Sequence, residues 1–448
     1  MAQTWSLPNY ARRQPNALPG AQTGPVSTPA SSTWPPAAAP IAGYALGGGT
    51  LVTGVTAATF YDDNIFATRS ARQSDVAFVG RPEFAWMAQG QNYTIGADGY
   101  IEGRRYVKYN SEDQVNGSFG VNFTVMPDTD TQIVSNARYL HAHLDRGSSD
   151  TVGPGGILLS TAFQSPIAYD QGIGSIALNK RYGQWWTSLG AAGVGIHYDN
   201  ASLLGGIVDF SYADGGIGVA NGRLGYVIAP LTSVFVEAAG NVRNWRVDVF
   251  DSTGYRVVGG VLFEQGPNAR LRGEAWAGYM NQQYNGVSFQ EVSNWTYGAS
   301  MAFLLTDQLT GVIEGRREAK EAALSLALIA PGVLGASAAV CSTSPGAACV
   351  SAIESTIAGR LEYRILANVA IGAGASYMVD DYLGPVAGHR SDRTLSPLAS
   401  LKYFPNDKVT LSFDYRRINF DPVGGQSAGV GAISYDRDVY LLSMNGRF

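Results

Sequence analysis

Charged residues recur at intervals of two along several segments of the chain. Around 98–104, 270–274, 314–318 and 360–364, acidic and basic side chains follow each other at positions of the same parity. Successive side chains of an extended strand point to opposite faces, so residues two apart share a face. We therefore expect one charged face, made up of Asp98, Glu102, Arg104, Arg270, Arg272, Glu274, Glu314, Arg316, Glu318, Arg360, Glu362, Arg364, Asp414, Arg416 and Arg437.

Two kinds of chemistry fit such a face. Rings of charged side chains around a water-filled passage select ions or sugars. Alternatively, the two signs brace each other as ion pairs between neighbouring strands and select nothing. Segments 314–318 and 360–364 would lie on consecutive strands, so opposite charges are expected to pair between them. Because both signs occur on each segment rather than on opposite walls, the bracing interpretation is favoured.

Other combinations of reactive residues are weaker. His141 and His143 share a strand face, but no third ligand lies at a spacing that would complete a metal site. The Asp-Asp-Asn sequence at 62–64 lacks the full series of oxygen ligands of a calcium loop, and we interpret it as an Asx-type turn. Asp145 and Ser148 lie near His143 without any nucleophile motif. The sequence therefore predicts no enzyme activity, no metal and no cofactor.

Apolar and polar residues alternate along the elements that would position these charges. In the stretch Ser434–Phe448, the apolar Tyr440, Leu442 and Met444 fall on one face, and Asn445 lies on the other. The same period appears at 93–106, 115–125, 357–365 and 409–416. A helix would require apolar residues three and four apart, so these segments are predicted to be β-strands.

Turn chemistry indicates how the strands are connected. Short polar, Pro or Gly connections occur at 89–92, 127–130, 182–184, 229–232, 265–269, 306–308, 366–368 and 405–408. Longer, irregular segments lie between them, at 66–74, 145–164, 199–211, 282–288, 321–350, 382–390 and 421–432. Eight tight turns join sixteen strands, and Leu51–Tyr61 and the last strand bring the total to eighteen.

The strand pattern predicts an all-β fold, a closed antiparallel transmembrane β-barrel of about 18 strands (16–18). The last strand should pair antiparallel with Leu51–Tyr61 and so remove both edges of the sheet. Tight turns should face the periplasm and longer loops the outside, with both termini periplasmic. Aromatic residues should form two interfacial girdles. These are Trp86, Trp185, Trp186, Tyr226, Phe235 and Phe404 near the tight turns, and Tyr106, Trp245 and Tyr279 near the long loops.

Composition agrees with a thin wall between lipid and water. Of 448 residues only 15% are charged, whereas Gly numbers 55 and Tyr 24. The net charge of −5 excludes a strongly basic nucleic-acid binder. Residues 1–48 are rich in Pro, Ala and Ser and are predicted to be a periplasmic linker or tail, followed by the barrel at 49–448. Met1 is not followed by a basic start and an apolar segment, so we expect a signal peptide to have been removed.

The segment 321–349 is the longest apolar connection. It could fold inward and narrow the passage, cap the outer rim as a short helix, or contact a neighbouring subunit. Cys341 and Cys349 lie within it, eight positions apart, and an oxidising compartment would allow a local disulfide between them.

A family resemblance rests on the first predicted hairpin. The stretch FYDDNIFAT (60–68), followed by SDVAFVGRPEFAW (74–86), resembles the opening of the family called putative β-barrel porin 2. Its typical places are held here by Tyr61, Asp62, Asp63, Asn64, Ile65, Phe66, Ser74 and Asp75. The PDTD turn and the terminal Phe448 also look like the family, and Phe448 resembles the assembly signal that closes bacterial outer-membrane barrels. The resemblance, expected to cover 50–448, implies an integral outer-membrane barrel of Gram-negative bacteria with surface-exposed loops.

The function expected on these grounds is passive diffusion of small polar solutes through a mixed-charge lumen. Two alternatives stay open: export or anchoring of a surface exopolysaccharide, and a structural, lattice-forming surface protein with a plugged lumen. The expected partners are outer-membrane lipid and lipopolysaccharide, the barrel assembly machinery, a further copy of the chain in a homo-oligomer, and a polysaccharide. Nucleic acid is not among them.

Overall fold

The computed structural model describes residues 43–144, 146, 163–203, 206–263, 270–286, 289–323, 349–383, 391–423 and 434–448. Among these residues, no helix has the length and apolar character needed to cross a membrane. The helical structure described is limited to three single turns of 3₁₀ helix, η2 (Asn110–Glu112), η4 (Ser211–Ala213) and η5 (Asp248–Phe250).

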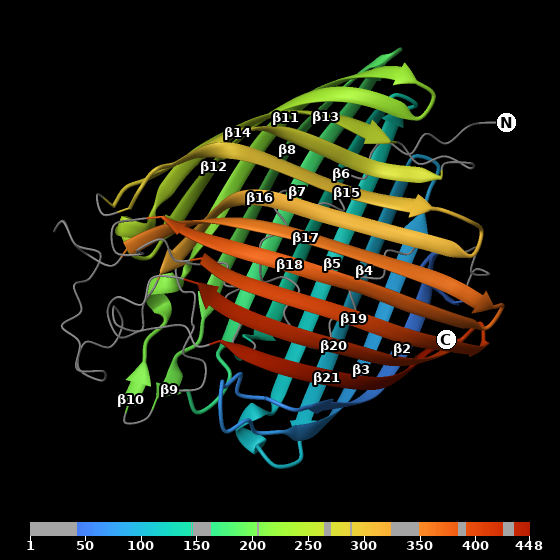
Figure 1. Cartoon of the computed structure of the whole chain (residues 1–448). Helices are drawn as coiled ribbons and strands as arrows, with labels where there is room; N and C mark the ends of the chain where they lie inside the picture. Colours follow the sequence, from blue (N-terminus) through green and yellow to red (C-terminus); the bar gives the residue numbers. More distant parts are fainter. Residues whose placement is uncertain are drawn as a thin grey trace.

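Eighteen long strands form one antiparallel sheet that closes on itself (Figure 1). Each strand pairs with the next one along the chain, apart from the short β9 and β10, and β21 pairs with β2. The strands are β2 (Gly49–Asp62), β3 (Asp75–Gln89), β4 (Tyr93–Tyr106), β5 (Gln114–Asp128), β6 (Thr131–His143), β7 (Ala168–Tyr182), β8 (Trp185–Tyr198), β11 (Gly215–Ala229), β12 (Thr232–Trp245), β13 (Ser252–Phe263), β14 (Leu271–Tyr284), β15 (Val292–Leu304), β16 (Leu309–Ala323), β17 (Cys349–Leu366), β18 (Val369–Leu383), β19 (Ser391–Asn406), β20 (Val409–Val423) and β21 (Tyr435–Arg447).

The seam between β2 and β21 closes the barrel. Their register runs from Gly54 opposite Arg447 to Asp62 opposite Val439. Backbone hydrogen bonds of 3.0 and 2.8 Å between Thr53 and Phe448 continue it by one more pair. Both edges of the sheet are thereby paired, which a sheet in lipid requires. The predicted count of eighteen strands and the predicted pairing of the first and last are confirmed.

The connections are short at one end of the barrel and longer at the other. Strands meet at all eight predicted tight connections, although 265–269 itself lies outside the described residues. Connections at 107–113 and 246–251 join the seven predicted long ones at the opposite end. The β8–β11 connection contains a small hairpin, β9 (Ala201–Leu203) and β10 (Gly206–Val208).

A short strand precedes the barrel. β1 (Tyr44–Leu46) pairs with the start of β2 through Gly47 and Gly48, whose φ values of 58° and 79° suit a two-residue hairpin turn. The indole Nε1 of Trp86 on β3 donates to the Leu46 carbonyl at 2.8 Å. Residues 44–46 therefore join the sheet, and β2 begins at Gly49.

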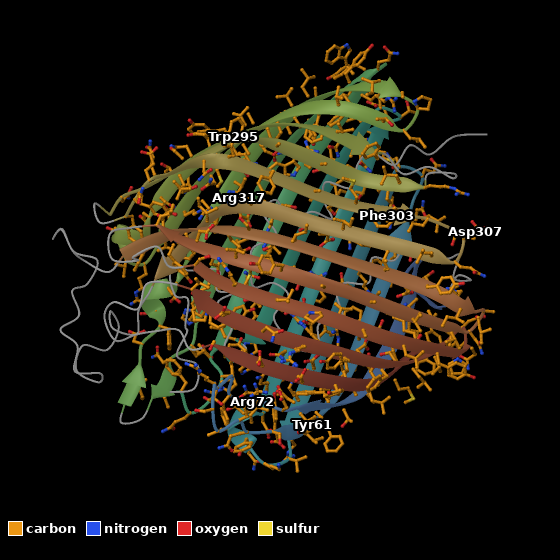
Figure 2. All side chains as sticks on the ribbon, in the orientation of Figure 1. Tyr61, Arg72, Trp295, Phe303, Asp307 and Arg317 are labelled. Atoms are coloured by element: carbon orange, nitrogen blue, oxygen red, sulfur yellow. The ribbon has the colours of Figure 1, made fainter. Side chains whose placement is uncertain are left out.

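The outer face of the barrel is apolar. Side chains such as Ile101 and Val115 are 63% and 61% exposed, and Trp295 is 68% exposed. Figure 2 shows Trp295 and Phe303 on the outer side of β15, near the long-loop end and the tight-turn end respectively. Because successive side chains point to opposite faces, every second residue of a strand faces the lumen instead, as do Phe60 and Ala77, which are fully buried.

Four aromatic residues predicted for the girdles instead face the lumen. Tyr106, Trp186, Phe235 and Trp245 are only 4–6% exposed and lie in buried apolar clusters. Tyr106 shares its face with Arg104, two residues earlier, so the strand period places it inside. The distance of an aromatic residue from a turn therefore indicates its position along the barrel axis. Whether its position in the strand is odd or even decides whether it faces lipid or the lumen.

The seam register can be tested with cysteine pairs in a chain whose native cysteines are replaced by Ser. Thr56→Cys with Asn445→Cys should form a disulfide, because the two residues are directly opposite. Directly paired Cα atoms are about 4.5–5.5 Å apart, within the roughly 4.4–6.8 Å that a disulfide spans. Thr56→Cys with Ser443→Cys, a diagonal pair at about 7–8 Å, is the control. Equal cross-linking of the two pairs, judged by gel mobility of the boiled, unreduced protein, would contradict this register.

Candidate functional site: the inner wall of the barrel

The inner wall joins opposite charges across a glycine on the strand between them. Nη2 of Arg138 on β6 lies 2.8 and 2.6 Å from the two carboxylate oxygens of Asp98 on β4. Gly120 of β5 stands between them, and a Cβ added there would lie 2.5 Å from that Nη2. Because Gly120 has no side chain, Asp98 and Arg138 on the two flanking strands can pair across β5.

The same arrangement recurs on β17, β18 and β19. Arg360 donates to Ser400 Oγ at 3.1 Å across Gly372, while Glu362 accepts from Lys402 Nζ at 2.6 Å. Arg360 also lies 3.8 Å from Glu362 on its own strand. Glu362 therefore forms one ion pair within its own strand and another across two steps of the sheet.

The expected pairing of segment 314–318 with 360–364 is wrong. Strand β17 begins earlier than predicted, and the register sets Glu318 opposite Glu354 and Glu314 opposite Ala358. Arg316 forms the ion pairs instead, at 2.9 Å to Glu318 and 3.1 Å to Glu354. The sequence shows the spacing of charges along each strand, but it does not specify the register between the strands.

This register produces an acidic row across four strands. Glu318 on β16 is opposite Glu354 on β17, which is opposite Asp380 on β18, which is opposite Asp392 on β19. Like charges directly opposite each other cost free energy. Arg316 and a 3.1 Å hydrogen bond from the Tyr382 hydroxyl to Asp392 offset part of that cost. The acidic row lies at the long-loop end of one wall.

A buried cluster of four charges spans the inner face from β11 to β14. Arg223 lies 2.5 Å from Glu237 and 2.8 Å from Glu274, and Arg256 lies 2.7 Å from Glu237. The side chains of Arg223, Glu237 and Glu274 are at most 6% exposed. Arg223 also lies over the ring of Phe235, 4.1 Å from its centroid. Two strands separate β11 from β14, so this cluster braces a section of wall as one unit.

The remaining predicted pore-lining residues occupy different surroundings. Glu102 pairs with Arg104 at 3.2 Å, and both are buried. Glu314 is exposed, and Arg270 precedes β14 at the tight-turn end, where it too is exposed. Arg272, Arg364, Asp414 and Arg416 are partly exposed on β14, β17 and β20. A pore-lining role for all of them stays a prediction. Cys341 lies outside the described residues, so the structure does not test its disulfide with Cys349.

The long-loop end of the lumen is lined by buried aromatic residues. Tyr106, Tyr198 and Trp245 each end a strand, and the backbone N–H of each donates to an aspartate that precedes the next strand of the barrel. The acceptors are Asp113, Asp214 and Asp251, at 2.7, 2.8 and 2.7 Å. A 3₁₀ turn directly precedes each aspartate. This repeated connection was not recognised in the sequence, where only an aromatic residue and a later Asp mark it.

The 62–64 sequence connects the first and last strands. Asn64 N–H donates to Asp62 Oδ1 at 3.0 Å, which confirms the predicted Asx turn. The buried Asp62 carboxylate lies 2.5 Å from Arg437 of β21. Asp63 continues the seam, since its carboxylate accepts from the Asp438 N–H at 2.6 Å.

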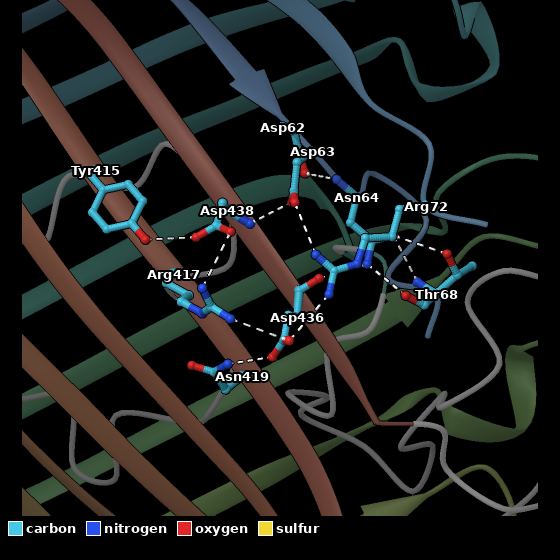
Figure 3. A network of polar contacts seen from close by, with 10 residues as sticks. All are labelled: Asp62, Asp63, Asn64, Thr68, Arg72, Tyr415, Arg417, Asn419, Asp436 and Asp438. Atoms are coloured by element: carbon cyan, nitrogen blue, oxygen red, sulfur yellow. Dashed lines mark hydrogen bonds and ion pairs between the residues drawn. The ribbon is translucent and has the colours of Figure 1, made fainter. Parts of the chain in front are cut away.

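A polar network covers the outer side of the same seam (Figure 3). Arg72 bridges Asp63 and Asp436 at 3.3 Å each, and Arg417 lies 3.4 Å from Asp436 and 3.8 Å from Asp438. The first long connection is therefore fixed to β20 and β21 at the rim of the barrel.

Three histidines near the long-loop end have polar partners. His141 lies 2.8 Å from Asp170, His143 lies 2.9 Å from Asn116, and His197 lies 2.7 Å from Asp214. Among the residues described, no three His, Cys, Asp or Glu side chains are grouped so as to hold a metal ion. These pairs fix the ends of β6, β7 and β8 that lie at the long-loop end of the barrel.

Two carboxylates in the long connections are held ionised by local hydrogen bonds. The pKa of Asp209 is lowered because the backbone N–H of Ser211 donates to it at 2.8 Å. The pKa of Glu291 is lowered because the Asn281 amide and the Ser293 hydroxyl donate to its carboxylate. Both carboxylates are therefore ionised at neutral pH.

The family model described as "Putative beta-barrel porin 2" matches residues 36–327, more than half of the chain. The chain belongs to this family. The match begins before the range expected from the first hairpin and ends within the β16–β17 connection. As a member of this family, the protein is an integral outer-membrane β-barrel. No curated protein matches the chain.

Several solved structures are similar to this chain at low sequence identity. OccK2 (OpdF) of Pseudomonas aeruginosa is 12% identical, with a TM-score of 0.44 over 89% of this chain and 98% of its own. OpdL of the same organism is 12% identical, with a TM-score of 0.41 over 90% and 99%. The siderophore receptor PirA, also of P. aeruginosa, is 10% identical, with a TM-score of 0.39 over 88% and 80%.

The buried cluster on β11–β14 of this porin-family barrel makes a stability prediction. Glu237→Ala should destabilise the barrel by about 3–5 kcal/mol, because it leaves Arg223 and Arg256 without the carboxylate they share. The control Glu314→Ala removes an exposed glutamate of the same inner face and should change stability by less than about 0.5 kcal/mol. Unfolding in urea, followed by tryptophan fluorescence in detergent micelles, measures both. Equal losses in the two variants would contradict a bracing role for the cluster.

Proposed function

We propose that the protein is a channel for passive diffusion of small polar solutes across the outer membrane. The observation that carries this proposal is a closed barrel of eighteen strands with charges of both signs on its inner face. Barrels of 16–18 strands are wide enough to hold an aqueous channel, whereas smaller ones are filled by side chains. A polar inner wall lowers the cost of transferring hydrated solutes from bulk water.

The ion pairs on the inner wall suit solutes of either sign. Arg138 is paired with Asp98, and Lys402 with Glu362, so little net field arises from these parts of the wall. A hydrophilic solute would exchange hydrogen bonds with water for hydrogen bonds with partly exposed Arg, Asp and Glu side chains. Discrimination would depend first on solute size and only second on charge.

The orientation proposed follows from the two ends of the barrel. The tight-turn end, where β2 begins and β21 ends, would face the periplasm, and the long connections would face the outside. Lipopolysaccharide would contact the rim of long connections, and the barrel assembly machinery would insert the chain. We also propose that the chain forms a homo-oligomer and contacts a surface polysaccharide.

Reconstitution tests the channel directly. Purified protein added to a planar lipid bilayer should produce stepwise conductance, and proteoliposomes should swell in small sugars faster than in larger ones. Liposomes with heat-denatured protein are the control. If natively folded protein gives neither conducting steps nor swelling, the proposal is overturned and a plugged, structural barrel is favoured.

The acidic row makes a prediction about charge selectivity. Asp380→Asn with Asp392→Asn removes two of its four carboxylates and should lower the permeability ratio of K⁺ to Cl⁻, on the order of twofold, because acidic side chains concentrate cations locally. Reversal potentials in a salt gradient measure this ratio. Asp414→Asn, on the same inner face nearer the tight turns, is the matched control. An unchanged ratio in the double variant would show that the row does not act on passing ions.

A further inference from the structure

Two arginines lie on the lipid-facing side of the barrel near its long-loop end. Arg317 on β16 shares its face with Ile313, which is 44% exposed, and Arg393 on β19 shares its face with Leu395, which is 45% exposed. Figure 2 shows Arg317 toward the long-loop end, as it does Trp295. Among the described residues, neither arginine has a carboxylate within ion-pair distance.

One row across the outer face contains both arginines. Arg317 is directly opposite Ser355 of β17 and donates to its Oγ at 3.0 Å. Ser355 is opposite Val379 of β18, which is opposite Arg393. On its other side, Arg317 is opposite Tyr297 of β15. We call these five residues the arginine row. Its two arginines are three steps of the sheet apart, roughly 14 Å along the wall.

The next row toward the tight turns is apolar. Ile357, Tyr377 and Leu395 are directly opposite one another on β17, β18 and β19. They are 57%, 38% and 45% exposed, and each lies two residues along its strand from a member of the arginine row. Tyr favours the membrane interface because its ring is apolar and its hydroxyl is polar. The arginine row therefore lies at the level where lipid tails end and headgroups begin.

Other outward arginines near the long-loop end have carboxylate partners in the chain. Arg72 and Arg417 both pair with Asp436, and Arg105 lies 3.8 Å from Asp113. A charged side chain that faces lipid without a partner is costly, and such residues mark functional sites.

The arginine row lacks such a partner within the chain. Asp421 of β20 is directly opposite Arg393, but the two side chains do not come within ion-pair distance. In a membrane interface the anion at hand is the phosphate of a lipid headgroup. A guanidinium suits this anion because its planar fork donates two parallel hydrogen bonds to phosphate oxygens.

We propose that the arginine row binds the phosphorylated disaccharide of lipopolysaccharide, with one phosphate on Arg317 and the other on Arg393. A disaccharide that carries a phosphate at each end spans a length similar to the separation of the two arginines. Its acyl chains would pack against Ile357 and Leu395 in the row below. The proposal rests on the orientation proposed above, in which this end faces the outside, and it assigns residues to the contact with lipopolysaccharide.

Lipid titration of the folded, full-length protein in detergent tests the proposal. Native mass spectrometry would count bound lipid A, the phosphorylated glycolipid end of lipopolysaccharide. Arg317→Gln and Arg393→Gln should each weaken its binding roughly fivefold, the contribution of one basic side chain near an anionic membrane surface. The double variant should lose more than either, whereas Arg317→Lys with Arg393→Lys, which keeps both charges, should lose less. Arg270→Gln with Arg447→Gln is the matched control, because it removes two exposed arginines at the tight-turn end.

The lipids compared decide which headgroup the row recognises. Lipid A with two phosphates should bind more tightly than lipid A with one, and more tightly than phosphatidylglycerol. Equal binding of phosphatidylglycerol, with an equal loss in the double variant, would overturn the assignment to lipopolysaccharide. Unchanged binding of lipid A to double-Gln protein that resists denaturation in cold SDS would overturn the site itself.

Conductance separates this site from the channel function. Both arginines face away from the lumen, so the double-Gln variant should conduct as the wild type does. A silent wild type that binds lipid A through the arginine row would overturn the channel and support the lipid site. A conducting wild type whose lipid binding is equal in the double-Gln variant and in the control would overturn the lipid site and leave the channel.

Discussion

The need to pair every backbone N–H and C=O in lipid determines the rest of this structure. A sheet can meet that need only by closing, because any free edge would expose a row of unpaired groups. The pairing of β2 with β21 is therefore the contact on which all seventeen other strand pairings depend. Ion pairs reinforce this seam on both faces of the wall. Asp62 and Arg437 form one on the inner face, and Arg72 and Arg417 form others on the outer face.

A wall one residue thick also determines how charge is arranged inside. No second layer of protein lies behind the inner face to supply partners for its charged side chains. Opposite charges must therefore compensate each other along the inner face itself. Glycines such as Gly120 let a long arginine reach a carboxylate two strands away. Along the row from Glu318 to Asp392, four carboxylates stand directly opposite one another on neighbouring strands, and Arg316 forms ion pairs with two of them. If the protein is the channel proposed above, its selectivity and its stability depend on the same side chains.

Local features of the sequence predicted the strands, the turns, the number of strands and the seam, because a period of two and Pro/Gly turn chemistry act over a few residues. The register between strands was harder to predict, because β17 begins at Cys349, before the residue Ile357 at which the alternation becomes visible in the sequence. The contacts of Arg223 with Glu274 and of Arg146 with Glu112 join residues 51 and 34 positions apart. No local pattern specifies such pairs, which depend on curvature of the wall and on how the connections pack. The inward aromatic residues differ from the prediction for a simpler reason, because the strand period and not the distance from a turn decides which face a side chain occupies.

The seam also constrains the order in which the chain can fold. Thr56 and Asn445, which are hydrogen-bonded across it, are 389 positions apart in the sequence. Hairpins between consecutive strands need only local loop closure, whereas this contact must wait until all the intervening strands are in place. Until then β2 remains an unpaired edge that could bind another strand. The first strand of the barrel is therefore the one that needs protection longest during assembly.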